Sequence, residues 1–344
     1  VTITHSGYIK RTNSDEYRLQ ARGGKGIKAA TTKSKKDAND FVEHLFAAQN
    51  HDYIMFFTNT GRVYVERVYE IDEAARSAQG RSIKNLLDMQ ADERIAAILR
   101  LERRVSEDGK DVTFAEDSGN VVFATKDGTV KKTALNDFVN HRKAGIIAIN
   151  LEEGNTLVNA ALTSGSDEVV LVTHDGMSIR FSESDMRAQG RNTIGVRGIK
   201  LREGDYVVAL AVVQQDANLL VVSENGLGKR TPFDEYRPQS RGGIGIKTMN
   251  CTDKTGRVVS ATTVTDADEL MIMTTGGQSV RMKVDTIRET GRATQGVKLI
   301  TLDGKESIQE ITLVIPDDDE DEEEAADTPD SDSAPADEAE APQE

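Results

Sequence analysis

The sequence has a single cysteine, Cys251, among its 344 residues, so the chain cannot form an internal disulfide. This scarcity fits a reducing compartment, and we expect the cytoplasm. A lone cysteine is typically a small buried apolar side chain. No apolar run reaches 18 residues, so the sequence predicts no transmembrane helix. The chain begins at Val1 with no signal-peptide pattern, and we expect it to be a fragment or a processed product.

Basic residues are missing from one end of the chain. Residues 316–344 have no Lys or Arg and no Ile, Leu, Val or aromatic residue, but they hold 15 of the 58 acidic residues. They therefore account for the net charge of −15, and residues 1–315 balance 43 acidic against 43 basic residues. Because this segment has too little apolar surface to offset the entropy of ordering, we expect a folded domain at 1–315 and a disordered acidic tail at 316–344.

Motifs for nucleotide or metal chemistry are also missing. The stretch at 18–28, RLQARGGKGIK, is rich in glycine and cations, but no Ser or Thr follows Lys25 to hold the metal of a P-loop. The five histidines are scattered without the spacing of zinc ligands and are interpreted as turn or surface residues. The sequence shows no clustered pair of acidic residues that would indicate acid–base catalysis. We therefore predict no catalytic residue, metal or cofactor in this chain.

The sequence contains instead a repeat of about 50 residues, present six times. Each copy has an apolar run, a Thr or Ser, two residues and then a glycine. Runs of β-branched residues closed by such turns indicate β-hairpins. The glycines are Gly7, Gly61, Gly128, Gly176, Gly226 and Gly277, and a cation follows four residues later in all copies but the second.

A second landmark follows each hairpin glycine after 19 to 22 residues. It consists of a small residue, then Ile or Val, then usually Lys, and it predicts a further short strand. The six copies stand at 26–28, 82–84, 148–150, 198–200, 245–247 and 296–298. Helical patterns are found at 36–49 and 91–101 and are interpreted as short insertions between units. The repeat therefore predicts an all-β fold with six blades in a propeller-like ring or spiral.

Lysines and arginines recur with the repeat. A cation at one position of every blade would form a belt around the ring, and such a belt suits duplex DNA, whose phosphates bind Lys and Arg as counterions are released. The alternative, that each cation is a solvated or ion-paired strand residue, stays open. The predicted belt consists of Lys10, Arg11, Lys28, Lys131, Lys132, Arg180, Arg191, Arg197, Lys200, Lys229, Arg230, Arg241, Lys247, Arg281, Arg292 and Lys298.

At these residues the chain resembles the C-terminal domain of the A subunit of bacterial DNA gyrase. The six repeats are similar to that family's six-bladed β-pinwheel. The family's gyrase A box is matched in six of seven positions by Gln20, Ala21, Arg22, Gly23, Gly24, Lys25 and Gly26. Ala21 departs from the box, where the family usually has a cation. The alternatives are the C-terminal domain of the A subunit of topoisomerase IV, which lacks an intact box, and a bladed scaffold for protein partners.

The resemblance implies that the chain binds double-stranded DNA and wraps it with positive handedness, with the box needed for the wrap. It implies an A2B2 holoenzyme that introduces negative supercoils, in which the N-terminal part of the A subunit cuts DNA while the B subunit uses ATP and Mg. The chain alone is then expected to be a monomer that bends DNA without catalysis and has no membrane partner. The acidic tail is expected to compete with DNA for the cations, and salt should weaken that effect.

Overall fold

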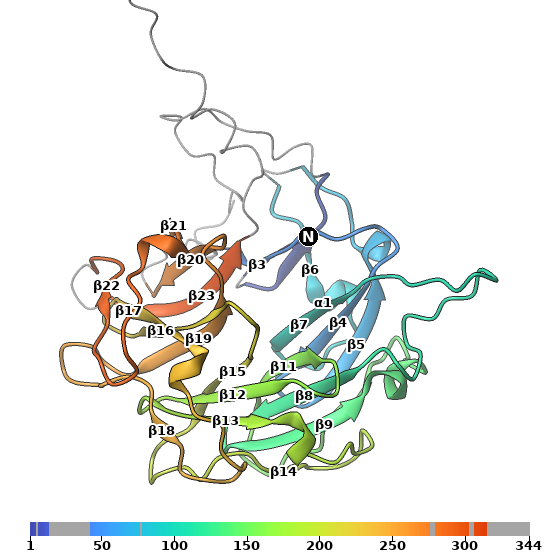
Figure 1. Cartoon of the computed structure of the whole chain (residues 1–344). Coiled ribbons are helices and arrows are strands. Elements are labelled where there is room, and N and C mark those ends of the chain that lie inside the picture. Colours follow the sequence, from blue (N-terminus) through green and yellow to red (C-terminus); the bar gives the residue numbers. More distant parts are fainter. Residues whose placement is uncertain (5, 14–41, 76–77, 276–278, 303–305, 315–344) are drawn as a thin grey trace, which may run out of the picture.

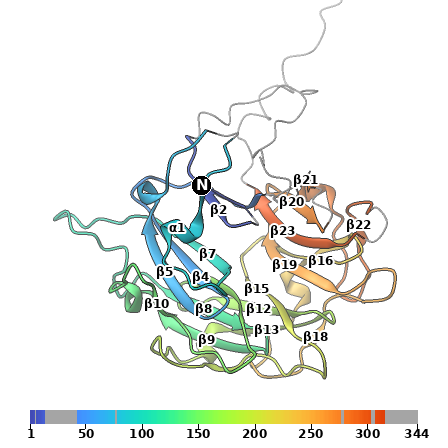
Figure 2. The same cartoon turned by 180° about the vertical axis from the view of Figure 1, so that it is seen from behind.

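The computed structural model describes residues 1–314 except 5, 14–41, 76–77, 276–278 and 303–305. The described chain forms six small sheets arranged as blades around a central axis (Figure 1; Figure 2). Its one α-helix, α1 (Ile83–Leu86), has four residues, and the other described helices are 3-10 turns of three or four residues. No helix within the described ranges is long and apolar enough to cross a membrane. The all-β, six-bladed expectation is confirmed.

Each of blades 1 to 5 has an inner strand near the axis, two hairpin strands and a short outer strand. Blade 1 contains β3 (Val42–Leu45), β1 (Thr2–Thr4), β2 (Tyr8–Lys10) and β6 (Arg81–Ser82), and blade 2 contains β7 (Ile95–Leu101), β4 (Tyr53–Thr58), β5 (Arg62–Arg67) and β10 (Ile146–Ile147). Blade 3 contains β11 (Leu157–Thr163), β8 (Asn120–Thr125), β9 (Thr129–Ala134) and β14 (Val196–Arg197), and blade 4 contains β15 (Val207–Val212), β12 (Glu168–Thr173), β13 (Met177–Ser182) and β18 (Ile246–Lys247). Blade 5 contains β19 (Val258–Val264), β16 (Asn218–Ser223), β17 (Leu227–Pro232) and β22 (Val297–Lys298), and blade 6 has three described strands, β23 (Ile308–Val314), β20 (Glu269–Thr274) and β21 (Ser279–Lys283).

The outer strand of each four-stranded blade is supplied by the next repeat. For example, β18 pairs with β13 of blade 4, although it follows the β16–β17 hairpin of blade 5 in the chain. The strands β6, β10, β14 and β22 are exchanged in the same way. Neighbouring repeats are therefore interlocked at the outer edge of the ring.

The hairpin turn explains the first landmark of the repeat. In blade 4 the N–H of Gly176 donates to the carbonyl of Thr173 at 3.0 Å, and the Thr173 hydroxyl accepts from the N–H of Met177 at 3.2 Å. Gly176 has a φ of +79°, and a Cβ there would lie 2.6 Å from the carbonyl oxygen of Met249. Glycine is required because the next repeat lies against the turn, where Thr248 donates to the Gly176 carbonyl.

The second landmark needs a correction at three of its copies. The short outer strands are 81–82, 146–147 and 196–197, one to two residues before the predicted positions. Residues 148–149 and 198–199 instead donate their N–H groups to the hairpin glycines Gly61 and Gly128. The predicted landmarks at 245–247 and 296–298 do contain β18 and β22, and the landmark at 26–28 lies outside the described residues.

The predicted helical insertions at 36–49 and 91–101 are wrong where the structure describes them, because both contain an inner strand, β3 and β7. Both faces of an inner strand are covered by neighbouring blades. Ile98 packs against the cluster that includes Ile3 of blade 1, and Leu99 packs against the cluster that includes Phe123 of blade 3. The strand therefore lacks the alternation of apolar and polar residues that marks a half-buried strand. A short apolar run of this kind cannot be distinguished from a helix by its sequence pattern. Residues 36–41 lie outside the described ranges.

The inner strands of neighbouring blades contact each other around most of the ring. Successive inner strands contact each other from β7 through β11, β15 and β19 to β23, and β23 contacts β3 of the first blade. The apolar core lies between adjacent blades in five clusters, such as the one formed by Val170, Leu219 and Tyr236 between blades 4 and 5. This packing leaves the short outer strands β14, β18 and β22 on the rim of the ring (Figure 1).

Candidate nucleic-acid interface

In blades 1, 3, 4 and 5, the cation four residues after the hairpin glycine binds the next repeat. Arg180 donates to the carbonyls of Phe233 at 2.7 Å and Tyr236 at 3.2 Å and is paired with Glu168. Lys132 contacts Glu183 in the same way, through the carbonyl at 2.9 Å and the carboxylate at 3.6 Å. Each cation thus holds the 3-10 turn of the neighbouring repeat, at Phe233–Glu235 for Arg180 and at Glu183–Asp185 for Lys132. Similar carbonyl contacts are made by Arg11 to Ile71 and by Arg230 to Ile287 and Asp285.

The lysine three residues after the hairpin glycine is fully buried in blades 1, 3 and 5. The ammonium of Lys131 donates to the carbonyls of Ala148 and Arg191, both at 2.6 Å, and that of Lys229 donates to the carbonyls of Gly291 at 2.7 Å and Arg292. Lys10 does the same to the carbonyl of Ala78 at 2.8 Å. Burial lowers the pKa of Lys131 and of Lys229 to about 8, because an apolar interior disfavours the charged form.

These placements correct the predicted belt at five of its sixteen cations. The side chains of Lys10, Lys131, Lys132, Lys229 and Arg230 are buried, at 0 to 8% exposure, and their donors are bound to the protein itself. A group without accessible surface cannot contact a phosphate in this conformation, so we assign these cations to holding the repeats together. Arg11, Arg180 and Arg281 are more accessible, but each is in an ion pair, with Glu73, Glu168 and Glu269 respectively.

Six of the other predicted cations lie on the rim, namely Arg191, Arg197, Arg241, Lys247, Arg292 and Lys298. We define the outer segments as residues 186–197, 236–247 and 287–298, which run from the 3-10 turns into β14, β18 and β22 on blades 3, 4 and 5. Each outer segment has a cation at its second, sixth and twelfth positions. These are Arg187, Arg191 and Arg197, then Arg237, Arg241 and Lys247, then Arg288, Arg292 and Lys298. The first and last cations of each segment are exposed.

The middle arginines link one outer segment to the next. Arg191 donates to the carbonyl of Ile147 at 3.3 Å, Arg241 to that of Arg197 at 3.1 Å, and Arg292 to that of Lys247 at 3.1 Å. In each case the acceptor is the last residue of the outer strand on the neighbouring blade. The cations of the rim are therefore held in a continuous arrangement across blades 3, 4 and 5.

The exposed cations of the outer segments are available to a ligand. Arg187, Arg197, Arg237, Arg288 and Lys298 make no ion pair with another described residue, and Lys247 has only a long hydrogen bond of 3.4 Å to Asn250. Lys200 is also exposed without such a partner. Acidic groups are close by, since Glu235 accepts from the N–H of Arg292 at 3.3 Å.

Sequence reasoning missed Arg187, Arg237 and Arg288, which are exposed, as are the last cations of the segments. The signal was available: the spacing of four and then six residues repeats without change. The same spacing occurs at Arg18, Arg22 and Lys28, and this copy contains the predicted box at 20–26. Residues 14–41 lie outside the described ranges, so the box and Lys28 have no structural description here.

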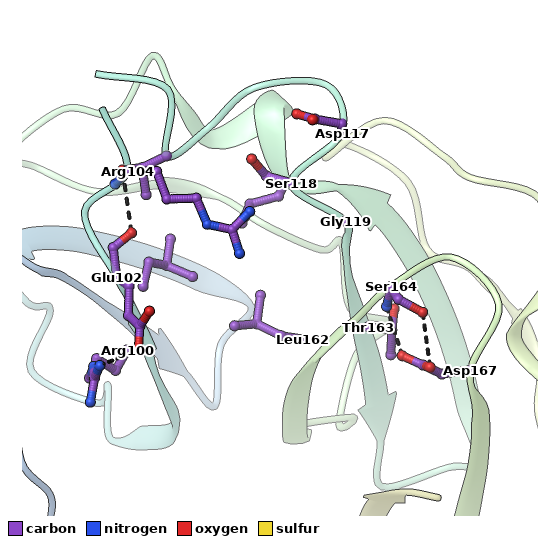
Figure 3. A pocket seen from close by; sticks show the side chains of 13 residues that line it. Arg100, Glu102, Arg104, Asp117, Ser118, Gly119, Leu162, Thr163, Ser164 and Asp167 are labelled. Atoms are coloured by element: carbon purple, nitrogen blue, oxygen red, sulfur yellow. Dashed lines mark hydrogen bonds and ion pairs between the residues drawn. The ribbon is translucent and has the colours of Figure 1, made fainter. Parts of the chain in front are cut away.

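A cavity on blades 2 and 3 has different chemistry. It has a volume of about 650 Å³ and lies between the end of β7, residues 102–119 and the turn after β11 (Figure 3). Arg104 points into it, and Asp167, which accepts from the Ser164 hydroxyl at 2.9 Å, lies opposite. Its mixed charges do not suit a polyanion. In the described residues, no three or more His, Cys, Asp or Glu side chains are grouped to hold a metal ion.

A ring of six interlocked blades with cations along its rim defines a class of all-β domains that carry a charged outer edge. The model of one such family, the DNA gyrase C-terminal domain, beta-propeller, matches this chain. The match has six segments, at 1–49, 52–102, 119–164, 167–214, 217–265 and 268–314. The chain therefore belongs to the DNA gyrase C-terminal domain family.

Curated relatives agree with this family. The A subunit of DNA gyrase from Halalkalibacterium halodurans is 50% identical over 93% of this chain, and that from Escherichia coli is 43% identical over 90%. The chain spans about a third of the length of these relatives, 36% and 34%. A solved structure of the DNA gyrase A C-terminal domain is 28% identical, covers 91% of this chain and 98% of that chain, and has a TM-score of 0.72. A C-terminal domain of DNA topoisomerase IV, 24% identical over 91% of this chain and 92% of that chain, has a TM-score of 0.73 and shows the fold alone.

Proposed function

We propose that this chain is a DNA-wrapping domain that binds duplex DNA along its outer segments and bends it around the rim of the ring. One observation carries the proposal: three consecutive outer segments present cations with the same spacing at the edge farthest from the axis. A smooth run of cations neutralises phosphates without reading sequence, and bending the stiff duplex is repaid by the additional phosphate contacts.

The rim is not uniform, and this suggests where the DNA lies. The positions that correspond to the outer cations are Ser82 on blade 1 and Ile147 on blade 2, so these two blades lack the last cation of the segment. Blades 3, 4 and 5 have it. We place the DNA path over blades 3 to 5. Extending it to the box at 20–26 rests on the sequence alone and stays a prediction.

The wider function rests on the family. We propose that the chain acts in an A2B2 gyrase holoenzyme in the cytoplasm, where the wrap has positive handedness and the holoenzyme introduces negative supercoils. Cleavage of DNA would then belong to the N-terminal part of the A subunit, and use of ATP and Mg to the B subunit. The acidic segment 316–344 would compete with DNA for the rim, and deleting it should raise DNA affinity most at low salt.

The test is the linking number of DNA. The full chain is incubated with relaxed circular DNA, a nicking-closing enzyme is added, and topoisomers are separated on a gel. We expect a shift to positive linking number that decreases when Arg237 and Lys247 are both changed to Ala. Lys110→Ala is the matched control, because Lys110 lies outside the six family segments and is paired with Asp108 at 2.9 Å. Binding that does not respond to salt, with no shift in linking number, would contradict the proposal.

A further inference from the structure

Two outer segments carry an exposed isoleucine between their cations. Ile194 lies three residues from both Arg191 and Arg197, and Ile244 lies three residues from both Arg241 and Lys247. Ile194 is 45% exposed, and Ile244, at 60%, is the most exposed large apolar side chain in the described part of the chain. Large apolar side chains that are exposed at corresponding positions of neighbouring repeats indicate a contact surface.

The backbone on both sides of each isoleucine is fixed. On the C-terminal side, Gly195 and Gly245 lie so close to the neighbouring hairpin strand that a Cβ would be 2.4 Å from the Val130 carbonyl oxygen and 2.3 Å from that of Ser178. On the N-terminal side, the carbonyl of the preceding residue accepts from the neighbouring blade: Lys200 donates to Gly243 at 2.8 Å.

The corresponding hydrogen bond at the residue before Ile194 runs from the N–H of Asn150 to the carbonyl of Thr193, at 3.0 Å. The two isoleucine backbones are therefore held in the same way on blades 3 and 4. Neither segment can turn its tip inward without breaking contacts on both sides. A rigid, exposed apolar group loses little conformational entropy when a partner covers it.

The flanking cations identify that partner as the duplex itself. A polyanion held by the arginines on both sides brings its surface onto the isoleucine between them. The apolar parts of that surface are the deoxyribose carbons that line the grooves. Where a duplex bends toward a protein, the groove that faces the protein narrows, so its walls come closer to a side chain at this position. Insertion between base pairs is excluded on this side, because a wedge in the minor groove bends DNA toward the major groove and thus away from the wedge.

We propose that Ile194 and Ile244 make apolar contacts with the sugar-lined groove of the wrapped DNA and supply a part of the binding that salt does not weaken. The inference rests on the proposed function and adds to it a second kind of contact. In the third segment Gln295 has the corresponding position, and in the box it is Lys25, so the apolar contact is limited to blades 3 and 4.

The test is the salt dependence of affinity of the full chain for a duplex of random sequence. Counterion release fixes the slope of log affinity against log salt, whereas an apolar contact changes the affinity without changing the slope. We expect Ile244→Ala and Ile194→Ala each to weaken binding about three- to ten-fold at every salt concentration, from the apolar area removed, with the slope unchanged. Ile244→Lys, which copies the box, should steepen the slope by about one phosphate contact.

Val105→Ala is the matched control, because Val105 is also 45% exposed but lies outside the six family segments. It should bind like the unchanged protein. Folded isoleucine variants that bind with unchanged affinity at all salt concentrations would overturn the inference, and so would a loss that disappears at high salt. Either result leaves the proposed function standing, which fails separately if the unchanged chain shows no salt-dependent binding at all.

Discussion

The guanidinium of Arg241 donates to the main-chain carbonyl of Arg197, 3.1 Å away on the neighbouring blade. Its Nε donates to the carbonyl of Asp185 at 3.0 Å, so two bonds fix the direction of the side chain. The outer strand that ends at Arg197 and the segment that begins after Asp185 are therefore held against the next blade by one arginine. Arg241 thus both contributes charge to the rim and positions the neighbouring exposed cation.

These two contributions can be separated by substitution. Arg241→Lys keeps the charge but loses the planar fork that reaches both carbonyls, so we expect an unchanged salt slope and a moderately lower DNA affinity. Arg241→Ala should lower the affinity further and reduce the slope by about one. Fluorescence anisotropy of a labelled duplex over a range of salt measures both quantities. Equal effects of the two substitutions on the slope would argue against a phosphate contact by Arg241.

Substitution of Lys132 should change stability and not DNA binding, because Lys132 is buried against Glu183. The Glu183 carboxylate also accepts from the N–H groups of Gly165 and Asp167, both at 2.8 Å. Lys132→Met should lower the free energy of unfolding by about 3 kcal/mol, since it leaves a buried carboxylate without its cation. The salt slope of DNA binding should not change. A variant that is as stable as the unchanged protein but has a lower slope would restore Lys132 to the DNA interface.

The buried lysines should make stability depend on pH. The pKa of Lys229 is about 8 in the folded chain, below the value of about 10.4 expected when unfolded. Between these values the unfolded chain binds more protons, so this group raises the free energy of unfolding as pH rises from 8 to 10.4 and has no effect on the slope below pH 8. Urea unfolding at several pH values measures this.

The comparison that isolates the effect is Lys229→Met. The stability difference between the unchanged protein and this variant should grow between pH 8 and 10 by at most about 1.4 kcal/mol per pH unit, which is the limit set by a difference of one bound proton. A difference that stays constant over this pH range would mean that the pKa of Lys229 is not lowered.

The parts of the fold that could be predicted from the sequence are those that depend on local contacts. The turn at Gly176 needs a positive φ and a hydroxyl three residues earlier, and both requirements are visible in the sequence. The exchange of β18 could not be predicted, because a strand of two residues has no periodicity and pairs with a hairpin about 70 residues earlier.

The candidate site could be predicted only in part, because it also depends on contacts between repeats. Recurrence in the repeat identified Lys247 on the rim, but it identified Lys132 and Lys229 as well. The sequence shows that a cation recurs, not whether its partner is solvent or a carbonyl of the next repeat. That partner is set by contacts between repeats, such as the bond from Lys132 to Glu183. Only the spacing of four and then six residues, which includes Arg237, distinguishes the rim cations from the buried ones.

The exchanged strand gives a final prediction, because it depends on one close approach. Gly245 has a φ of +72°, and a Cβ there would lie 2.3 Å from the Ser178 carbonyl oxygen. Gly204 has a similar φ of +78°, but a Cβ there would meet nothing within 4 Å. Gly204→Ala is therefore a control that carries only the backbone strain, which costs about 1 kcal/mol.

Gly245→Ala should lower the free energy of unfolding by about 2 kcal/mol more than the control, since β18 must move away from β13 to make room. DNA affinity should fall in this variant alone, because Lys247 is the last residue of the displaced strand. Urea unfolding and DNA titration of the two variants measure these effects. Equal stability losses would show that the outer strand is not held by this contact. A stability loss without a loss of affinity would show that the DNA does not depend on the exchanged strand of blade 4.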